Sequence, residues 1–185
     1  MGTIKFGTDG WRGIIGEDFT LENIKFLTEG LSNHIKNQTK KPLKDFKVTI
    51  GYDTRFLSNE SALLISRILA ENSIKVDLSS SPVPTPVVSY TTSKNNSDYG
   101  IIVTASHNPG IWNGIKIKDS KGKSISEIEA NLIEVEISNL KSNKKIDKYI
   151  DFEKAEERGL ITKISPLKDY IKNLTKLVDV EKIKS

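Results

Sequence analysis

The amino-acid sequence predicts an α/β fold in which helices flank a mixed β-sheet. Along the chain, segments with apolar residues at helical spacing are interspersed with strand-like segments, in which apolar residues alternate with polar ones or form a continuous run. A strand, a helix and a second strand follow one another between residues 46 and 78, an order that favours a right-handed parallel crossover. A tight-turn signal at Asn113-Gly114 then leads into a returning strand, so the sheet is expected to be mixed.

Two helices and two strands are expected before residue 80. Thr20 can cap the first helix, whose apolar residues recur three and four positions apart. These apolar residues are Leu21, Ile24, Leu27, Leu31 and Ile35. Residues 46–52 alternate as a strand does, Ser58 can cap the second helix, and residues 74–78 form the second strand.

Between residues 81 and 140 the sequence predicts two further helices and two further strands. The proline-rich segment 81–86 opens a short helix, and residues 99–103 and 115–118 are the strands. Ser126 and Glu129 match a capping box ahead of a long helix that ends near residue 140. The apolar residues assigned to this helix are Ile128, Leu132 and Val135.

A change in composition near residue 145 predicts a domain boundary. Residues 141–147 are rich in lysine and lack an apolar period, which is typical of a linker. Residues 151–164 fit neither a helix nor a strand clearly, whereas Ser165-Pro166 can begin a helix whose partner surface is expected outside this chain. The apolar side of that helix holds Leu167, Tyr170, Ile171 and Leu174.

Composition and charge exclude several classes of protein. Apolar residues make up 36% and charged residues 28% of the 185 residues, as in a soluble globular chain. Because the chain has no long apolar run and no secretory signal, we expect a cytoplasmic protein without a membrane partner. The net charge of +4 comes from scattered lysines, so no nucleic-acid partner is expected. Without cysteine, the chain has neither disulfides nor thiolate metal sites.

The segment Thr-Ala-Ser-His-Asn-Pro at residues 104–109 is the candidate catalytic site. Ser106 follows a predicted buried strand where it gives way to a loop, a suitable position for a nucleophile that carries a phosphoryl or acyl group. The returning strand brings Lys116 back toward this loop. Serine, asparagine and proline also fill ordinary turns for conformational reasons, so the residues themselves leave both interpretations open.

Four segments of the chain, taken in order, resemble one known family. They are residues 5–13 (Lys-Phe-Gly-Thr-Asp-Gly-Trp-Arg-Gly), 51–58, 84–86 and 104–116. The first is similar to the N-terminal signature, and the last to the phosphoserine loop, of the α-D-phosphohexomutases, which include phosphoglucomutase and phosphomannomutase. The family has four domains. The resemblance therefore implies a phosphohexomutase first domain at residues 1–145, with residues 146–185 forming a linker and the opening helix of a truncated second domain.

The resemblance implies phosphoryl transfer centred on Ser106. Phosphorylated Ser106 would donate its phosphoryl group to a hexose monophosphate and recover one from the other end of the bisphosphate intermediate, which interconverts hexose 1-phosphate and 6-phosphate. Lys116 matches a family lysine that handles protons, and Arg12 matches an arginine that assists electrostatically. His107 matches a histidine that orients the loop or contacts phosphate. Taken alone, a strand lysine is usually solvated, and an arginine after Trp11 often stacks on the indole.

Small and polar neighbours are expected to support the loop or bind phosphate. Thr8 and Gly10 lie in a turn that lets the backbone approach a ligand. Asn108 is expected to hold the loop that carries Ser106, called the serine loop below, and Asn113 and Gly114 are expected to form the turn that follows it.

Other polar residues carry weaker signals. Asp53 and Arg55 either form a structural pair at a strand end or belong to an ordinary turn before a helix. His34 is expected to be a surface or boundary residue without a role. A relay between the adjacent Ser106 and His107 is not expected, because neighbouring side chains of extended backbone point in opposite directions.

The resemblance also implies cofactors and partners. Mg²⁺ is expected in the full-length enzyme, where this chain contributes only an oxygen of phosphorylated Ser106, because the family's Asp-Gly-Asp-x-Asp-Arg metal loop does not occur in the sequence. Hexose 1,6-bisphosphate is the expected activator, and phosphorylated hexose and the missing C-terminal domains are the expected partners. Alone, the chain is expected to bind no cofactor and to be inactive.

Two alternatives remain open from the sequence. A serine-nucleophile phosphatase fits the exposed serine. A non-catalytic sugar-phosphate-binding or interaction module fits the missing metal loop and the exposed final helix.

Overall fold

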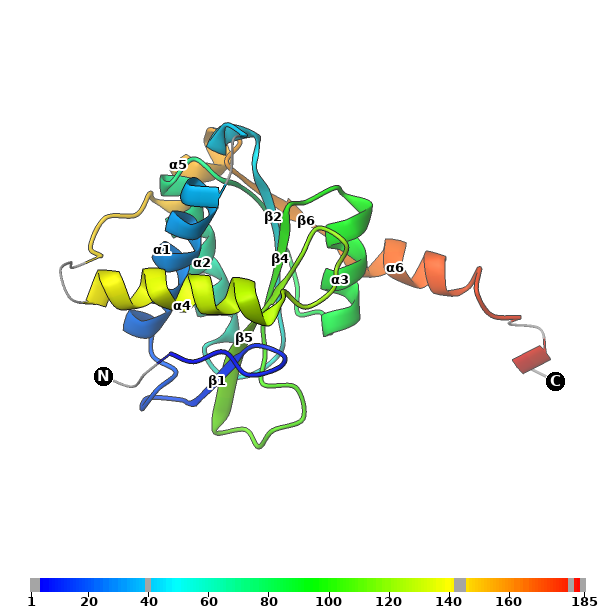
Figure 1. Cartoon of the computed structure of the whole chain (residues 1–185). Helices are drawn as coiled ribbons and strands as arrows, with labels where there is room; N and C mark the ends of the chain where they lie inside the picture. Colours follow the sequence, from blue (N-terminus) through cyan, green and yellow to red (C-terminus); the bar gives the residue numbers. More distant parts are fainter. Residues whose placement is uncertain (1–3, 39–40, 142–145, 180–181, 184–185) are drawn as a thin grey trace.

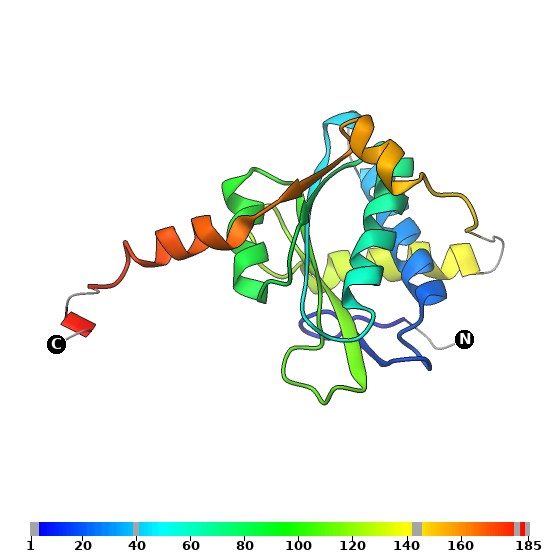
Figure 2. The same ribbon diagram turned by 180° about the vertical axis from the view of Figure 1, so that it is seen from behind.

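The computed structural model describes residues 4–38, 41–141, 146–179 and 182–183. A six-stranded sheet runs through the molecule with helices on both faces (Figure 1; Figure 2). In spatial order the strands are β1 (Trp11–Ile14), β5 (Trp112–Lys118), β4 (Tyr99–Val103), β2 (Lys47–Tyr52), β3 (Lys75–Ser79) and β6 (Ile161–Ile164). β5 runs antiparallel to both of its neighbours, and the other pairs are parallel. The mixed α/β sheet predicted from the sequence is therefore confirmed.

Helices cover the two faces of the sheet through separate apolar clusters. They are α1 (Leu21–Gln38), α2 (Ser58–Glu71), α3 (Thr85–Lys94), α4 (Glu127–Lys141), α5 (Phe152–Glu157) and α6 (Pro166–Leu174), with a 3-10 turn at Leu43–Asp45. α1, α2 and α4 pack in the larger cluster, and α3 covers the other face (Figure 1). β4 is buried on both sides, because Ile101 belongs to the larger cluster and Ile102 to the smaller one. This burial explains its continuous apolar run.

β1 was not predicted from the sequence, because its glycine-containing surroundings resemble a turn. Trp11 is buried and Arg12 exposed, as expected for alternating strand side chains. The strand pairs with β5 so that Arg12 lies opposite Gly114. β1 therefore places Arg12 beside the strand that follows the serine loop.

The buried face of α4 differs from the predicted one. Ile128, Leu132 and Val135 are 75%, 41% and 56% exposed. The buried apolar residues of this helix are instead Ala130, Ile133, Ile137 and Leu140. Gly30 of α1 explains why these residues are buried, because a Cβ atom at position 30 would lie 2.5 Å from a side-chain carbon of Ile137. Close approach of α1 and α4 at Gly30 leaves the predicted stripe facing outward.

Only some of the predicted caps form. An amide of the first turn of α1 donates to Thr20 Oγ1 at 3.2 Å, which confirms that cap. The amide of Glu129 donates to Ser126 Oγ at 3.2 Å, but its carboxylate accepts a hydrogen bond from Tyr99 Oη and lies 3.4 Å from His34 Nε2, so the capping box is incomplete. Hydrogen bonds with His34 and Tyr99 lower the pKa of Glu129 despite its partial burial. His34, expected near the surface, is only 4% exposed.

The C-terminal segment adds to the same sheet. The stretch left open by the sequence forms α5 and β6, and β6 pairs in parallel with β3. α6 begins where predicted, although the Ser165 hydroxyl bonds Ser80 Oγ at 3.1 Å instead of capping the helix. α6 packs on α3 through Tyr170 and Tyr90, whose ring centroids are 5.7 Å apart. The predicted boundary at residue 145 lies outside the described residues. Within those described, no helix has both the length and the apolar character to cross a membrane.

Candidate active site

The loop between β4 and β5 presents Ser106 at the surface in a left-handed backbone conformation. Its φ angle is 59°, and His107 beside it is also exposed, whereas Thr104 and Ala105 are buried. The amide of Ser106 donates to Thr104 Oγ1 at 2.9 Å, and the amide of Asn108 donates to Ala105 O at 3.1 Å. A left-handed conformation costs a non-glycine residue about 1–2 kcal/mol, and such strain clusters at functional sites. The surrounding contacts must therefore hold Ser106 in place.

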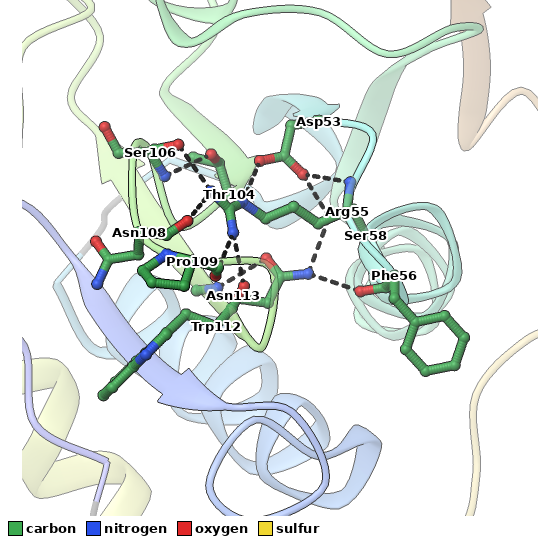
Figure 3. A network of polar contacts seen from close by, with 11 residues as sticks. Asp53, Arg55, Phe56, Ser58, Thr104, Ser106, Asn108, Pro109, Trp112 and Asn113 are labelled. Carbon is green, nitrogen blue, oxygen red and sulfur yellow. Dashed lines mark hydrogen bonds and ion pairs between the residues drawn. The ribbon is translucent and has the colours of Figure 1, made fainter.

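Arg55 lies against this loop and binds its backbone (Figure 3). The side chain comes from the segment between β2 and α2 and is 14% exposed. Its guanidinium donates to the carbonyl oxygens of Ser106 and Asn108 at 2.8 Å and to those of Pro109 and Trp112 at 3.0 Å. Four carbonyl groups of one loop thus share a single cation.

A second set of hydrogen bonds joins Asp53 to α2 and β5. Arg55 Nε lies 3.1 Å from Asp53 Oδ2, so the structural pair considered from the sequence does form. Ser58, predicted to cap α2, is the first residue of that helix, and its hydroxyl donates to Asp53 Oδ1 at 2.7 Å instead. Asn113 Nδ2 donates to Ser58 Oγ at 2.9 Å, and Asn113 Oδ1 accepts from the amide of Gly114 at 2.8 Å. Asn113 and Gly114, predicted from the sequence to form a turn, lie instead within β5, where they pair with Gly13 and Arg12 of β1. Asn113 ties β5 to the start of α2.

Gly10 and Gly114 allow β1 and the turn before it to lie close to β5. A Cβ atom at Gly114 would lie 2.4 Å from Trp11 O, and one at Gly10 would lie 2.4 Å from Ile115 O. Gly10 also has a φ angle of 102°, which side chains disfavour. Thr8 and Gly10 line a pocket of about 380 Å³ that extends to α4.

Asp9 binds two buried lysines of β5. Its carboxylate lies 2.6 Å from Lys116 Nζ and 3.3 Å from Lys118 Nζ, and it accepts a hydrogen bond from Ser124 Oγ at 2.8 Å. Lys116 and Lys118 are 6% and 7% exposed. Lys116 is therefore not an ordinary solvated lysine, and its charge is compensated by a carboxylate that is itself 41% exposed.

Arg12 points to the same face of the sheet as Lys116. Arg12 pairs with Gly114 in register, and residues two apart on a strand share a face. Trp11 points to the opposite face, where it stacks on Phe19 with ring centroids 5.6 Å apart. The alternative in which Arg12 stacks on Trp11 does not fit this arrangement, and Arg12 is exposed.

The lysines hold Asp9 in its ionised form. Burial alone would raise the pKa of Asp9. Hydrogen bonds from Lys116 and Ser124 and the nearby positive charges outweigh burial and lower this pKa from 3.8 to about 2. A carboxyl group whose pKa is lower in the folded state stabilises the fold above its unfolded pKa, and this stabilisation is lost as the pH falls through the folded value. We expect the free energy of unfolding to fall more steeply from about pH 5 to pH 2 in the wild type than in Asp9→Asn, as measured by urea unfolding. Equal slopes would contradict these ion pairs.

Sequence reasoning missed the roles of Asp9, Arg55 and Lys118. Lys118 repeats Lys116 two positions on, so the Lys-x-Lys pattern on a predicted strand was the available signal. For Arg55 the signal was the Asp-x-Arg spacing after a strand. Nothing in the sequence placed Asp9 beside the lysines, because that contact depends on the pairing of β1 with β5.

Comparison with known proteins identifies the family. The family model described as phosphoglucomutase/phosphomannomutase, alpha/beta/alpha domain I, matches residues 3–144. The chain belongs to the phosphoglucomutase/phosphomannomutase family. The resemblance found in the sequence is thereby confirmed.

Members of the phosphoglucomutase/phosphomannomutase family with known names or structures resemble the chain over part of their length. The chain is 40% identical over 123 residues to a phosphoglucosamine mutase of Clostridium acetobutylicum, covering 66% of the chain and 26% of that protein. It is 37% identical over 136 residues to a phosphoglucomutase of Staphylococcus aureus strain MRSA252, covering 70% and 23%. A crystal structure from Thermus thermophilus, assigned as a phosphomannomutase, matches with a TM-score of 0.79 and 30% identity, covering 97% of the chain and 37% of that protein. The chain thus spans about a quarter of these curated relatives.

Proposed function

We propose that this chain carries the phosphoserine of a phosphohexomutase and that further domains complete the enzyme. The exposed, left-handed Ser106 just after β4 carries this proposal, because a strained serine whose backbone is held by hydrogen bonds suits a phosphoryl carrier. Membership of the mutase family supports a phosphorylated hexose as the substrate. The short span relative to the curated relatives supports partner domains outside this chain.

The transfer takes place in two steps that return the serine to its starting state. A hydroxyl oxygen of the hexose monophosphate attacks the phosphorus on Ser106, the bond from phosphorus to Ser106 Oγ breaks, and the hydroxyl proton passes in net to Oγ. After the bisphosphate turns over, Ser106 Oγ attacks the phosphorus at the other end, the bond from that phosphorus to the sugar oxygen breaks, and the Oγ proton passes in net to the sugar oxygen of the departing isomeric monophosphate. Lys116 manages these protons, and Arg12 donates hydrogen bonds to phosphate oxygens.

Mg²⁺ is the proposed cofactor of the complete enzyme. Within the described residues, no group of three His, Cys, Asp or Glu side chains could hold a metal ion. This chain would therefore supply an oxygen of the Ser106 phosphate, and the remaining ligands would come from elsewhere. A metal bound there would offset negative charge on the transferring group.

The proposal is tested by locating the phosphate. The full-length protein is incubated with hexose 1,6-bisphosphate, digested, and its phosphopeptides are sequenced by mass spectrometry. We expect phosphate on Ser106 and interconversion of hexose 1-phosphate and 6-phosphate. Interconversion without phosphate on Ser106 would overturn the proposal. Release of inorganic phosphate without isomerisation would indicate a phosphatase, and hexose phosphate binding unaffected by Ser106→Ala and Arg12→Ala would indicate a binding module.

A further inference from the structure

Each N–H donor of the Arg55 guanidinium has a hydrogen-bond acceptor. An arginine side chain has five N–H donors in a planar fork. Nη1 binds the carbonyls of Pro109 and Trp112, Nη2 binds those of Ser106 and Asn108, and Nε faces Asp53 Oδ2 (Figure 3). All five donors are therefore used, and four of them hold the backbone of the serine loop.

These contacts act on the strained residue itself. The left-handed conformation of Ser106 is sparsely populated, so it persists only where surrounding contacts fix the peptides on either side. Arg55 binds the carbonyl of Ser106 and that of Asn108 two residues later. The carbonyl and amide of a trans peptide point in opposite directions. Arg55 binds the carbonyls of Ser106 and Pro109, so the amides of His107 and Gly110 in the same peptides point away from it.

The guanidinium is itself held in place from the opposite side. Asp53 accepts hydrogen bonds from the Arg55 amide at 3.0 Å and from Nε at 3.1 Å, so one carboxylate fixes both the main chain and the side chain of Arg55. Ser58 Oγ donates to the same carboxylate, and Asn113 Nδ2 donates to Ser58 Oγ. Because Asn113 belongs to β5, these hydrogen bonds connect Arg55 to the strand that follows the loop carrying Ser106.

We propose that Arg55 is a positioning residue that sets Ser106 for phosphoryl transfer by fixing the backbone of the serine loop. This inference rests on the proposed function. The site uses the planar, five-donor shape of the side chain, because four of its five acceptors are neutral main-chain carbonyls and only the fifth is the Asp53 carboxylate. Lysine has three donors on a single atom and cannot reproduce the fork.

The test compares Arg55→Lys and Arg55→Ala with a matched control in the full-length protein. Arg67→Lys is the control, because Arg67 also binds a backbone carbonyl, that of Ile150 at 2.9 Å, and packs on the Tyr149 ring. Displacement of a reacting group by about 1 Å can cost roughly 100-fold in rate. We therefore expect Arg55→Lys to lower kcat about 100-fold while KM changes less than roughly threefold. Arg67→Lys is expected to retain the wild-type kcat.

Two further measurements separate positioning from general loss of structure. Added guanidinium ion should restore part of the kcat of Arg55→Ala and none of that of Ser106→Ala. Hydrogen exchange of the amides of residues 104–113 should be faster in Arg55→Lys than in the wild type and unchanged in Arg67→Lys.

The outcomes distinguish this inference from the proposed function. Wild-type kcat and loop exchange in Arg55→Lys would overturn the role of Arg55 alone. Equal losses in Arg55→Lys and Arg67→Lys, without rescue by guanidinium, would overturn it as well, because they would indicate a loss of folded protein. Absence of phosphate on Ser106 in the wild type would overturn the proposed function, and the exchange data would still report whether Arg55 holds the loop.

Discussion

Alanine in place of Ser106 is expected to abolish interconversion of hexose phosphates by the full-length protein. Without Oγ there is no covalent carrier for the phosphoryl group, so kcat should fall about 10⁴-fold or more. The measurement is a coupled assay of hexose 6-phosphate formation, together with phosphopeptide mapping after incubation with the bisphosphate. Turnover retained by Ser106→Ala would contradict a phosphoserine mechanism.

Glycine at the same position is the matched control for the backbone. Ser106→Gly also lacks Oγ, so it should be as inactive as Ser106→Ala. The two variants should differ in stability, because alanine retains the cost of the left-handed conformation at φ 59° and glycine does not. We expect Ser106→Gly to be more stable than Ser106→Ala by about 1 kcal/mol in urea unfolding. Equal stability would contradict a left-handed conformation at this position.

Much of the fold follows from apolar periodicity alone. β2, β3 and β4 and the helices α1 and α2 carry patterns that a buried strand or a one-sided helix requires. The apolar residues assigned to α4 from the sequence are not its buried ones, because the helix has two apolar stripes. Which stripe is buried depends on the space that Gly30 leaves on α1. β1 was missed because its glycine-containing segment resembles a turn and its pairing with β5 is a long-range contact.

The candidate site was predictable only where a side chain carries the chemistry. Ser106 and Lys116 stand out in the sequence as residue types at a fixed spacing. Arg55 does not, because its acceptors are main-chain carbonyls, which every residue has. The partnership of Asp9 with Lys116 links residues more than one hundred positions apart, so it emerges only once the sheet is assembled.

Lys116→Met is expected to lower kcat about 10³-fold, the range typical of a lost general acid or base. Methionine keeps an unbranched side chain of similar length at a buried position, so the loss should come from the ammonium group. Asp9 keeps Lys118 and Ser124 as partners in this variant. Because Asp9 is also 41% exposed, the loss of unfolding free energy should stay below the roughly 3–5 kcal/mol typical of removing one partner of a buried ion pair. Steady-state kinetics and urea unfolding provide the two readouts.

The role of Asp9 in this pair is tested by a double-mutant cycle. If Asp9 acts by holding the Lys116 ammonium, Asp9→Asn should lower kcat by itself, yet add nothing once Lys116 is methionine. Lys118→Met is the matched control, because Lys118 is equally buried and also pairs with Asp9, but lies two residues farther from the serine loop, about 7 Å along β5. A loss in Lys118→Met as large as that in Lys116→Met would mean that the positive charge of the cluster matters, and not proton transfer at one position.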